Sequence, residues 1–161
     1  MTTKVKTLTH FAVLDTLLVV AACFVPAASH LFAAPLYMLN PMLALMLAGI
    51  LVGRDWRNAL ALAVLMPLVS CLVVGMPTAP KMVCMMGELA VVAGLFHLFE
   101  YRLGAVLSVF AAIVAGKVVY YAMKALILAP ATLVGTEWWI QLMAVALWGG
   151  LFAMVYNRVK K

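Results

Sequence analysis

The sequence predicts an all-α integral membrane protein with six transmembrane helices and both termini in the cytoplasm. The first observation is composition, because 68% of the 161 residues are hydrophobic and 10% are charged, whereas soluble domains are about 45 to 50% apolar and about 25% charged. The second is a series of apolar runs of about 17 to 25 residues, each long enough to cross a hydrocarbon core of about 30 Å. The third is the placement of lysine and arginine. We expect one membrane domain covering residues 1–161.

Six apolar runs are separated by breaks that contain proline, glycine or charged residues. The predicted spans are 8–25, 36–52, 57–74, 80–99, 103–128 and 138–156. Pro26 and Pro35 bound the first break, residues 75–80 form the third, and Glu100 to Arg102 form a tight fourth. Such short links between helices favour antiparallel neighbours.

The first thirty residues have some features of a cleavable signal peptide. Lys4 and Lys6 precede an apolar stretch, and a small-residue site lies near Ala27. Asp15 interrupts that stretch, and cleavage would leave five spans. We therefore expect this segment to be retained as the first helix.

Most of the 11 lysines and arginines fall on the side of the membrane that holds both termini. This group of basic residues comprises Lys4, Lys6, Arg54, Arg57, Arg102, Arg158, Lys160 and Lys161. Positively charged residues stay cytoplasmic, so this side is predicted to be the cytoplasm. The formal net charge of +6 is scattered between apolar runs, which does not fit the continuous basic stripe of a nucleic-acid-binding protein.

Three lysines depart from this distribution, namely Lys81, Lys117 and Lys124. A charge in the membrane interior is costly and is by default a functional hypothesis. With a rise of about 1.5 Å per residue, Glu88 lies roughly 12 Å from the outer end of its helix and Lys117 roughly 16 Å from the outer end of the next. The two side chains are therefore predicted to form a buried pair, with Lys81 and Lys124 nearer the outer surface.

Helical spacing places these charges on two stripes. Lys81 and Glu88 are seven residues apart on one face, and the second stripe follows the i, i+3, i+4, i+7 pattern through Lys117, Tyr120, Tyr121 and Lys124. If the stripes face each other, they line a net positive cleft that is open to the outside and suits an anionic ligand.

Structural alternatives exist for each of these residues. Lys81 and Lys124 can extend to the lipid headgroups, and Glu88 with Lys117 can be a purely structural ion pair. Tyr120, Tyr121, Trp138 and Trp139 fit an interfacial aromatic belt. Asp15 is expected to pair with a neighbouring helix rather than to move protons, and His97, Glu100 and Arg102 are expected to form a solvated cap at the cytoplasmic edge.

The chain lacks the motifs of several enzymes and pumps. Gly116-Lys117 is followed by Val118 and lacks the upstream glycine of a phosphate-binding loop, and His97 with Glu100 lacks the second histidine of H-E-x-x-H. Cys23, Cys71 and Cys84 lie inside apolar runs, which is typical of packing residues rather than of a disulfide or metal site. We expect a membrane-embedded binding protein that is not an enzyme, holds no cofactor or metal, and takes energy from elsewhere.

Three stretches carry a family resemblance: SHLF at 29–32, PLYMLNPM at 35–42 and GMPTAPKMVCMMGELA at 75–90. In a basic-ended six-helix chain of this size, they resemble the substrate-binding S component of an energy-coupling factor (ECF) type ABC transporter. The resemblance covers the whole chain in architecture and about residues 29 to 90 in motif. It implies a bacterial or archaeal cytoplasmic membrane protein that captures a vitamin or related micronutrient from outside. It also implies docking on a transmembrane coupling subunit that is driven by two cytoplasmic ATPase subunits.

The resemblance further implies a ligand site at the outer end, formed by loops after helices one, three and five and by helices four to six. Carried over by position, the substrate-binding residues would be Asn40, Lys81, Glu88, Lys117, Tyr120, Lys124, Trp138 and Gln141. Loops one and three, with Pro35, Pro77 and Pro80, would form the gate. The family's A-x-x-x-A motif on helix one is replaced by Ala12-x-x-x-Thr16, which suggests altered docking through this helix.

Three hypotheses for function remain at this point. The leading one is the substrate-specific subunit of a micronutrient importer. The second is a structural or scaffolding membrane protein without a small-molecule ligand. The third is a stand-alone proton-coupled carrier that uses Asp15 and Glu88.

Overall fold

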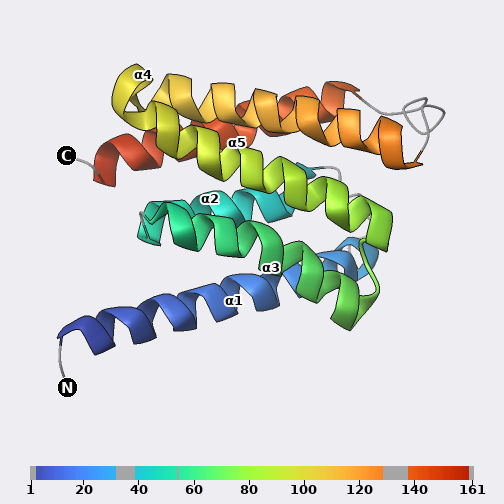
Figure 1. The fold of residues 1–161 in the computed structure, drawn as a ribbon, viewed down its shortest axis with the longest axis horizontal. Coiled ribbons are helices and arrows are strands. Elements are labelled where there is room, and N and C mark those ends of the chain that lie inside the picture. Colours follow the sequence, from blue (N-terminus) through green and yellow to red (C-terminus); the bar gives the residue numbers. More distant parts are fainter. Residues whose placement is uncertain (1–2, 32–38, 54, 129–137, 160–161) are drawn as a thin grey trace.

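The chain folds into a bundle of α-helices packed side by side (Figure 1). A computed structural model describes residues 3–31, 39–53, 55–128 and 138–159, without the side chains of 3–11, 27–31 and 138. The helices are α1 (Thr3–Leu31), α2 (Pro41–Gly53), α3 (Trp56–Val74), α4 (Ala79–Leu128) and α5 (Trp138–Val159). The described part of the chain has no β-strand, which confirms the all-helical prediction.

The long helix α4 is bent back on itself at Gly104. This residue has φ 75° and ψ 162°, outside the helical range, and glycine reaches positive φ without the steric penalty of a side chain. We call residues 79–103 the first arm of α4 and residues 105–128 its second arm; Figure 1 shows the two arms running back along each other. The predicted break at Glu100 to Arg102 was wrong by a few residues, because the chain turns at the glycine that follows those charges.

Local capping fixes the bounds of α3 close to the predicted 57–74. Asp55 precedes the helix in an extended conformation, and its carboxylate accepts a hydrogen bond from the Arg57 N–H at 3.0 Å. Gly75 ends the helix in the left-handed conformation (φ 75°), and its N–H donates to the Cys71 carbonyl at 3.0 Å. The predicted turn that starts at Gly75 is therefore confirmed.

Two other predicted boundaries were wrong. Helix α1 passes through Pro26 to Leu31, since proline is tolerated within helices that are packed in a membrane. Helix α2 begins at Pro41 rather than at residue 36, and Leu39 and Asn40 lie outside it; residues 36–38 of that prediction lie outside the described residues. Proline suits the first position of a helix because its missing N–H has no intrahelical role there.

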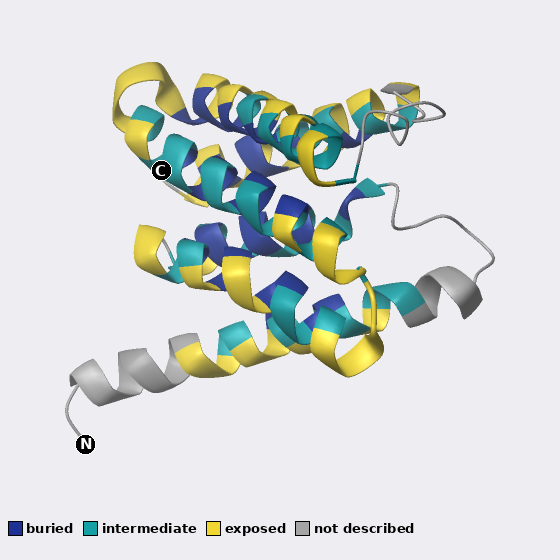
Figure 2. Cartoon of the chain, turned by 45° about the vertical axis from the view of Figure 1, so that its right-hand side comes forward, coloured by how far each residue is buried: buried dark blue, intermediate teal, exposed yellow. Residues whose placement is uncertain are grey.

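Some of the described helices, but not all, are long and apolar enough to span a membrane. Three of the described helices could cross a bilayer: Trp56–Val74, the bent α4 and Trp139–Val159. The described apolar parts of α1 (Ala12–Pro26) and α2 are shorter. Figure 2 shows buried residues inside the bundle and exposed residues around it, and many of the latter are large apolar side chains such as Leu72, Leu126 and Met154. Such a surface is compatible with a multi-pass membrane protein.

The core lies where α2, α3, the arms of α4 and α5 meet. Its fully buried side chains include Met46, Leu62, Val92 and Ile113. Helix α1 lies at the edge of the bundle (Figure 1) and, within the described part, packs against α2 and α3. The start of α1 and the end of α5 lie at one end of the bundle (Figure 1), which leaves the α3–α4 turn and the starts of α4 and α5 at the opposite end.

The three cysteines are placed as packing residues. Cys84 is buried, and Cys23 and Cys71 are half-buried, all as free thiols within helices. This agrees with the prediction made from their apolar sequence context.

Candidate functional site

A buried ion pair joins the two arms of α4. The Lys117 Nζ lies 2.9 Å from Glu88 Oε1, and the two side chains are only 12% and 2% exposed, respectively. Glu88 lies nine residues along the first arm and Lys117 eleven residues before the end of the second arm, so both are roughly 14 to 16 Å from the end of the bundle. The predicted contact between Glu88 and Lys117 is confirmed.

Asn40 brings the start of α2 to the same carboxylate. Its Nδ2 donates to Glu88 Oε1 at 2.8 Å, while its Oδ1 and backbone carbonyl accept from the Leu43 N–H at 3.4 and 3.0 Å. Asn40 is buried and has φ 49°, a conformation that asparagine tolerates better than most residues. It therefore caps α2 and holds Glu88 at once.

Helix α2 consequently starts deep in the bundle rather than at its surface. With 13 residues it is about 20 Å long, and its N-terminus lies level with Glu88. A helix N-terminus carries partial positive charge and stabilises a nearby carboxylate. Irregular backbone at membrane depth is tolerated only where protein buries it or where it lines a cavity, so the short α2 marks this level as unusual.

Trp148 on α5 satisfies the backbone at that irregular point. Its indole Nε1 donates a hydrogen bond to the Leu39 carbonyl across 109 positions of sequence. Sequence reasoning missed this residue, because a tryptophan in an apolar helix has the same appearance in sequence whether it faces lipid or a carbonyl. The only available signal was that tryptophan usually finds a hydrogen-bond partner when buried.

Gln141 and Tyr120 complete the surroundings of Lys117. The ammonium donates to Gln141 Oε1 on α5 at 3.0 Å and lies 5.6 Å from the centroid of the Tyr120 ring. Tyr121 meets Tyr120 edge to face at 5.2 Å. We define the polar network as Asn40, Glu88, Lys117 and Gln141, which joins α2, both arms of α4 and α5.

Glycine at position 116 makes the close approach of the two arms possible. A Cβ at this position would lie 2.5 Å from Val92 Cγ2 and 3.0 Å from the Glu88 carbonyl oxygen. Gly87 has a similar role, since a Cβ there would lie 2.5 Å from Met123 Sδ. The small residues beside Glu88 and Lys117 therefore set the distance between the charges, a role that sequence reasoning did not assign to them.

The remaining predicted site residues lie closer to the end of the bundle. Lys81 and Lys124 are half-buried and close enough for their ammonium groups to repel each other. These two lysines are basic residues of the two arms in addition to Lys117, which is paired with Glu88. Trp138 begins α5, but its side chain lies outside the described residues.

Asp15 pairs with a neighbouring helix, as predicted. Its Oδ1 accepts a hydrogen bond from Asn58 Nδ2 on α3 at 2.9 Å, at a half-buried position. The contact ties the edge helix α1 to the rest of the bundle.

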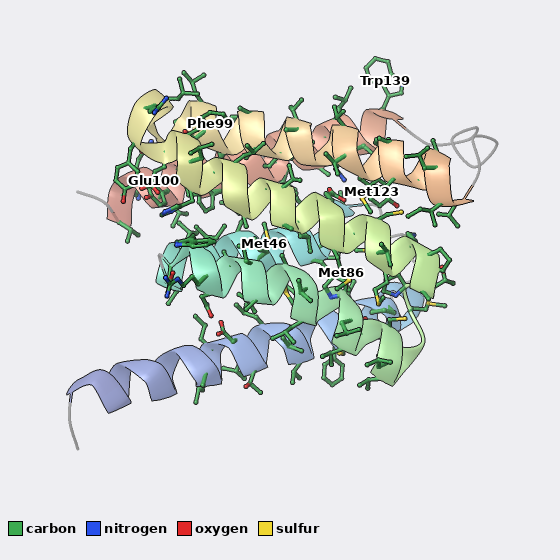
Figure 3. All side chains as sticks on the ribbon, in the orientation of Figure 1. Met46, Met86, Phe99, Glu100, Met123 and Trp139 are labelled. Carbon is green, nitrogen blue, oxygen red and sulfur yellow. The ribbon has the colours of Figure 1, made fainter. Side chains whose placement is uncertain are left out.

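The prediction of a solvated cap formed by His97, Glu100 and Arg102 was right for only one residue. Arg102 is exposed, but Glu100 is half-buried and accepts a hydrogen bond from Tyr156 on α5, a residue that is 4% exposed. Figure 3 shows Glu100 at the bend of α4 and Met86 and Met123 in the opposite half of the bundle. The residues around Glu100 thus form a separate region, far from the polar network.

Comparisons with known proteins do not identify the chain. No family model matches it, and neither the curated proteins nor the solved structures contain a significant match.

Proposed function

We propose that this chain is the substrate-binding subunit of an ECF-type importer, with six membrane spans, both termini in the cytoplasm and an outward-facing ligand site. It would capture a vitamin or related micronutrient and deliver it through a transmembrane coupling subunit driven by two cytoplasmic ATPases. Its location would be the cytoplasmic membrane of a bacterium or archaeon. In this proposal the chain itself performs no covalent chemistry.

The observation that carries the proposal is the depth at which α2 begins. Its N-terminus, capped by Asn40, meets Glu88 and Lys117 inside the bundle. Interrupted helices at membrane depth are typical of transporter binding sites, where a helix end and charged groups together hold a ligand. In the sequence, Asn40 and Gln141 of the polar network follow closely after residues 32–38 and 129–137, the first and fifth loops that the family resemblance assigns to the site; both loops lie outside the described residues.

Charge placement favours a ligand with an anionic group. Glu88 and Lys117 neutralise each other at 2.9 Å, whereas Lys81 and Lys124 add positive charge near the end of the bundle. Lys81 lies seven residues from Glu88 on the first arm, and Lys124 lies seven residues from Lys117 on the second, which is about 10 Å along each helix. We therefore favour a ligand with a carboxylate toward the outside and neutral polar groups toward the network.

One observation favours the structural alternative. Among the described residues, no buried side-chain nitrogen or oxygen lacks a hydrogen-bond partner. Glu88 and Lys117 are thus satisfied by Asn40 and Gln141 within the chain itself. A scaffolding protein whose polar network only joins helices would have the same contacts.

A thermal-shift screen separates the two functions. Purified protein in detergent is heated with biotin, pantothenate, nicotinate, folate, thiamine and riboflavin in turn. A ligand at 100 times its Kd adds about 2.7 kcal/mol of stability, which corresponds to a rise in Tm of about 5 °C or more for a protein of this size. If no micronutrient, in this set or a wider one, raises the Tm of a well-folded sample, the importer function loses its support.

A further inference from the structure

A cavity lies at the end of the bundle where α1 starts and α5 ends (Figure 1). The described residues enclose a cavity of about 170 Å³ between α2, α3, the first arm of α4 and α5. A single water needs only about 10 to 15 Å³, so this cavity accommodates a group of several non-hydrogen atoms. Its floor is apolar and buried, formed by Ile50, Ala59, Ala93 and Phe96.

Aromatic rings form the walls of this cavity. His97 stacks on Trp56 with ring centroids 6.3 Å apart at 26°, and Tyr101 meets His97 edge to face at 6.2 Å. Tyr156 adds a third electron-rich ring from α5. Trp56 and Tyr101 are 43% and 79% exposed, so the walls reach the surface and leave the cavity accessible.

Two carboxylic acid residues line the cavity, beside His97 and the two tyrosines. Asp55 and Glu100 are these acidic residues, and no lysine or arginine among the residues that the structure describes lines the cavity. The described part of the chain has two other acidic residues. Asp15 accepts a hydrogen bond from Asn58, and Glu88 is paired with Lys117 and Asn40. Two carboxylates therefore converge on one aromatic cavity in a chain whose formal net charge is +6.

This combination suits an organic cation better than a metal ion or an anion. Ammonium groups are attracted to the faces of tryptophan and tyrosine within about 6 Å, and the Trp56 ring already has the Arg57 guanidinium 5.9 Å from its centroid. The described residues contain no cluster of three His, Cys, Asp or Glu side chains suited to a metal. An anion would be repelled by the two carboxylates.

We propose that the cavity between Trp56, Tyr101, Tyr156 and Glu100 binds an alkylammonium group, such as the methylated or primary amine of a lipid headgroup or of a free amine. The aromatic rings contact the alkyl part and the carboxylates balance the charge. Arg57, beside Trp56 and outside the cavity lining, is placed to meet the phosphate of a zwitterionic headgroup.

Choline provides a direct probe of this site. Its neutral isostere, 3,3-dimethyl-1-butanol, has the same shape without the charge. The full chain is placed in nanodiscs of phosphatidylglycerol alone, and saturation-transfer NMR measures the apparent Kd of each compound. We expect choline to bind about tenfold more tightly than the alcohol, and the variants Trp56→Leu and Glu100→Gln to weaken choline binding by about the same factor.

Controls keep the test decisive. Trp139→Leu applies the same substitution to a tryptophan that is 80% exposed at the other end of the bundle (Figure 3), and it should retain the wild-type Kd. Glutamine at position 100 keeps an oxygen that can accept from the Tyr156 hydroxyl, and Trp56 is partly exposed, so Trp56→Leu remains informative even if Glu100→Gln fails to fold. Equal binding of choline and the alcohol, or a folded Trp56→Leu variant with wild-type affinity, would overturn the proposal.

The source of the ammonium group is decided by the lipid. If phosphatidylethanolamine in the nanodisc weakens choline binding relative to phosphatidylglycerol alone, the natural occupant is a headgroup. If the Kd of choline is unchanged, the occupant is a free amine.

Discussion

Glu88 is the residue on which the polar network depends. One of its carboxylate oxygens receives both the Asn40 amide at 2.8 Å and the Lys117 ammonium at 2.9 Å. At 2% exposure, a carboxylate without these donors would be strongly destabilising, since breaking a buried pair costs far more than exchanging the pair for apolar groups. This asymmetry makes the pair testable by single and double substitution.

Removing only one of the two charges should destabilise the bundle. We expect Glu88→Gln and Lys117→Met each to lower the free energy of unfolding by about 3 to 5 kcal/mol, because each leaves an uncompensated charge inside the bundle. The double variant Glu88→Gln/Lys117→Met should recover most of the loss. Equilibrium unfolding in detergent measures all three.

Lys124→Met is the matched control for Lys117→Met on the same arm. This lysine lies near Lys81, and among the described residues it forms no ion pair with an acid, so its removal should leave stability unchanged or slightly raised. If the loss in the double variant equals the sum of the two single losses, the two charges do not interact, and the proposed pair is contradicted.

The residues of the network were partly predictable. Counting residues from the ends of the predicted helices placed Glu88 and Lys117 at similar depths, because a helix has a fixed rise and a charge in an apolar run is conspicuous. The contact from Trp148 to Leu39 was not predictable, since it depends on how α2 enters the bundle and spans 109 positions of sequence. The cavity around Glu100 was missed for the same reason, as Tyr156 lies 56 residues further along the chain.

At the scale of elements, glycines decide how closely the two arms of α4 approach each other. Gly116 has no room for a Cβ between Val92 and the Glu88 carbonyl, whereas a Cβ at Gly94 would meet nothing within 4 Å. Both residues lie inside helical arms. Comparing substitutions at Gly116 and Gly94 therefore distinguishes the effect of close packing from the effect of the low helix propensity of glycine.

Gly116→Ala and Gly94→Ala should consequently have opposite effects. The first forces the arms apart and should lower stability by about 1 to 3 kcal/mol, while the second should raise it by about 0.5 to 1 kcal/mol because alanine is the better helix former. Thermal unfolding of both variants provides the comparison. Equal shifts of Tm would contradict the close contact between the arms at Gly116.

Element boundaries were predicted well where the signal is local. Asp55 and Gly75 fix α3 within a residue of expectation because capping depends on adjacent residues. The predicted start of α2 at residue 36 was wrong. The position of Asn40, just before the helix, depends on its hydrogen bond to Glu88, which lies 48 positions away in the sequence. The bend of α4 was placed at the charges Glu100 to Arg102, although the backbone turns at Gly104, where positive φ is needed.

The whole molecule has two chemically distinct ends. One end has the start of α1, the end of α5 and the acidic aromatic cavity, with Arg57, Arg102 and Arg158 as its described basic side chains (Figure 1). The other end has the α3–α4 turn, with Lys81 and Lys124 nearby. The excess of lysine and arginine at the first end predicts that it faces the cytoplasm. The bundle would then present the polar network toward the outside and the cavity toward the inside.

Cysteine labelling tests this orientation. Thr78→Cys places a thiol in the exposed α3–α4 turn, and Tyr101→Cys places one beside the bend of α4 at a position that is 79% exposed. We expect a membrane-impermeant maleimide to label the first variant in intact cells and the second only after lysis. The wild-type chain, whose three cysteines are buried or half-buried in helices, gives the background. The reverse pattern would contradict the proposed topology.

The central claim is that the polar network binds a ligand and does not only hold helices together. The most direct test is the affinity of the folded double variant Glu88→Gln/Lys117→Met for the micronutrient that stabilises the wild-type chain, measured by isothermal titration calorimetry. Since hydrogen bonds to charged groups contribute about 1.5 to 3 kcal/mol each, the importer function predicts an increase in Kd of at least about tenfold with the fold intact. A folded double variant with wild-type affinity would contradict it and leave the network with a structural role alone.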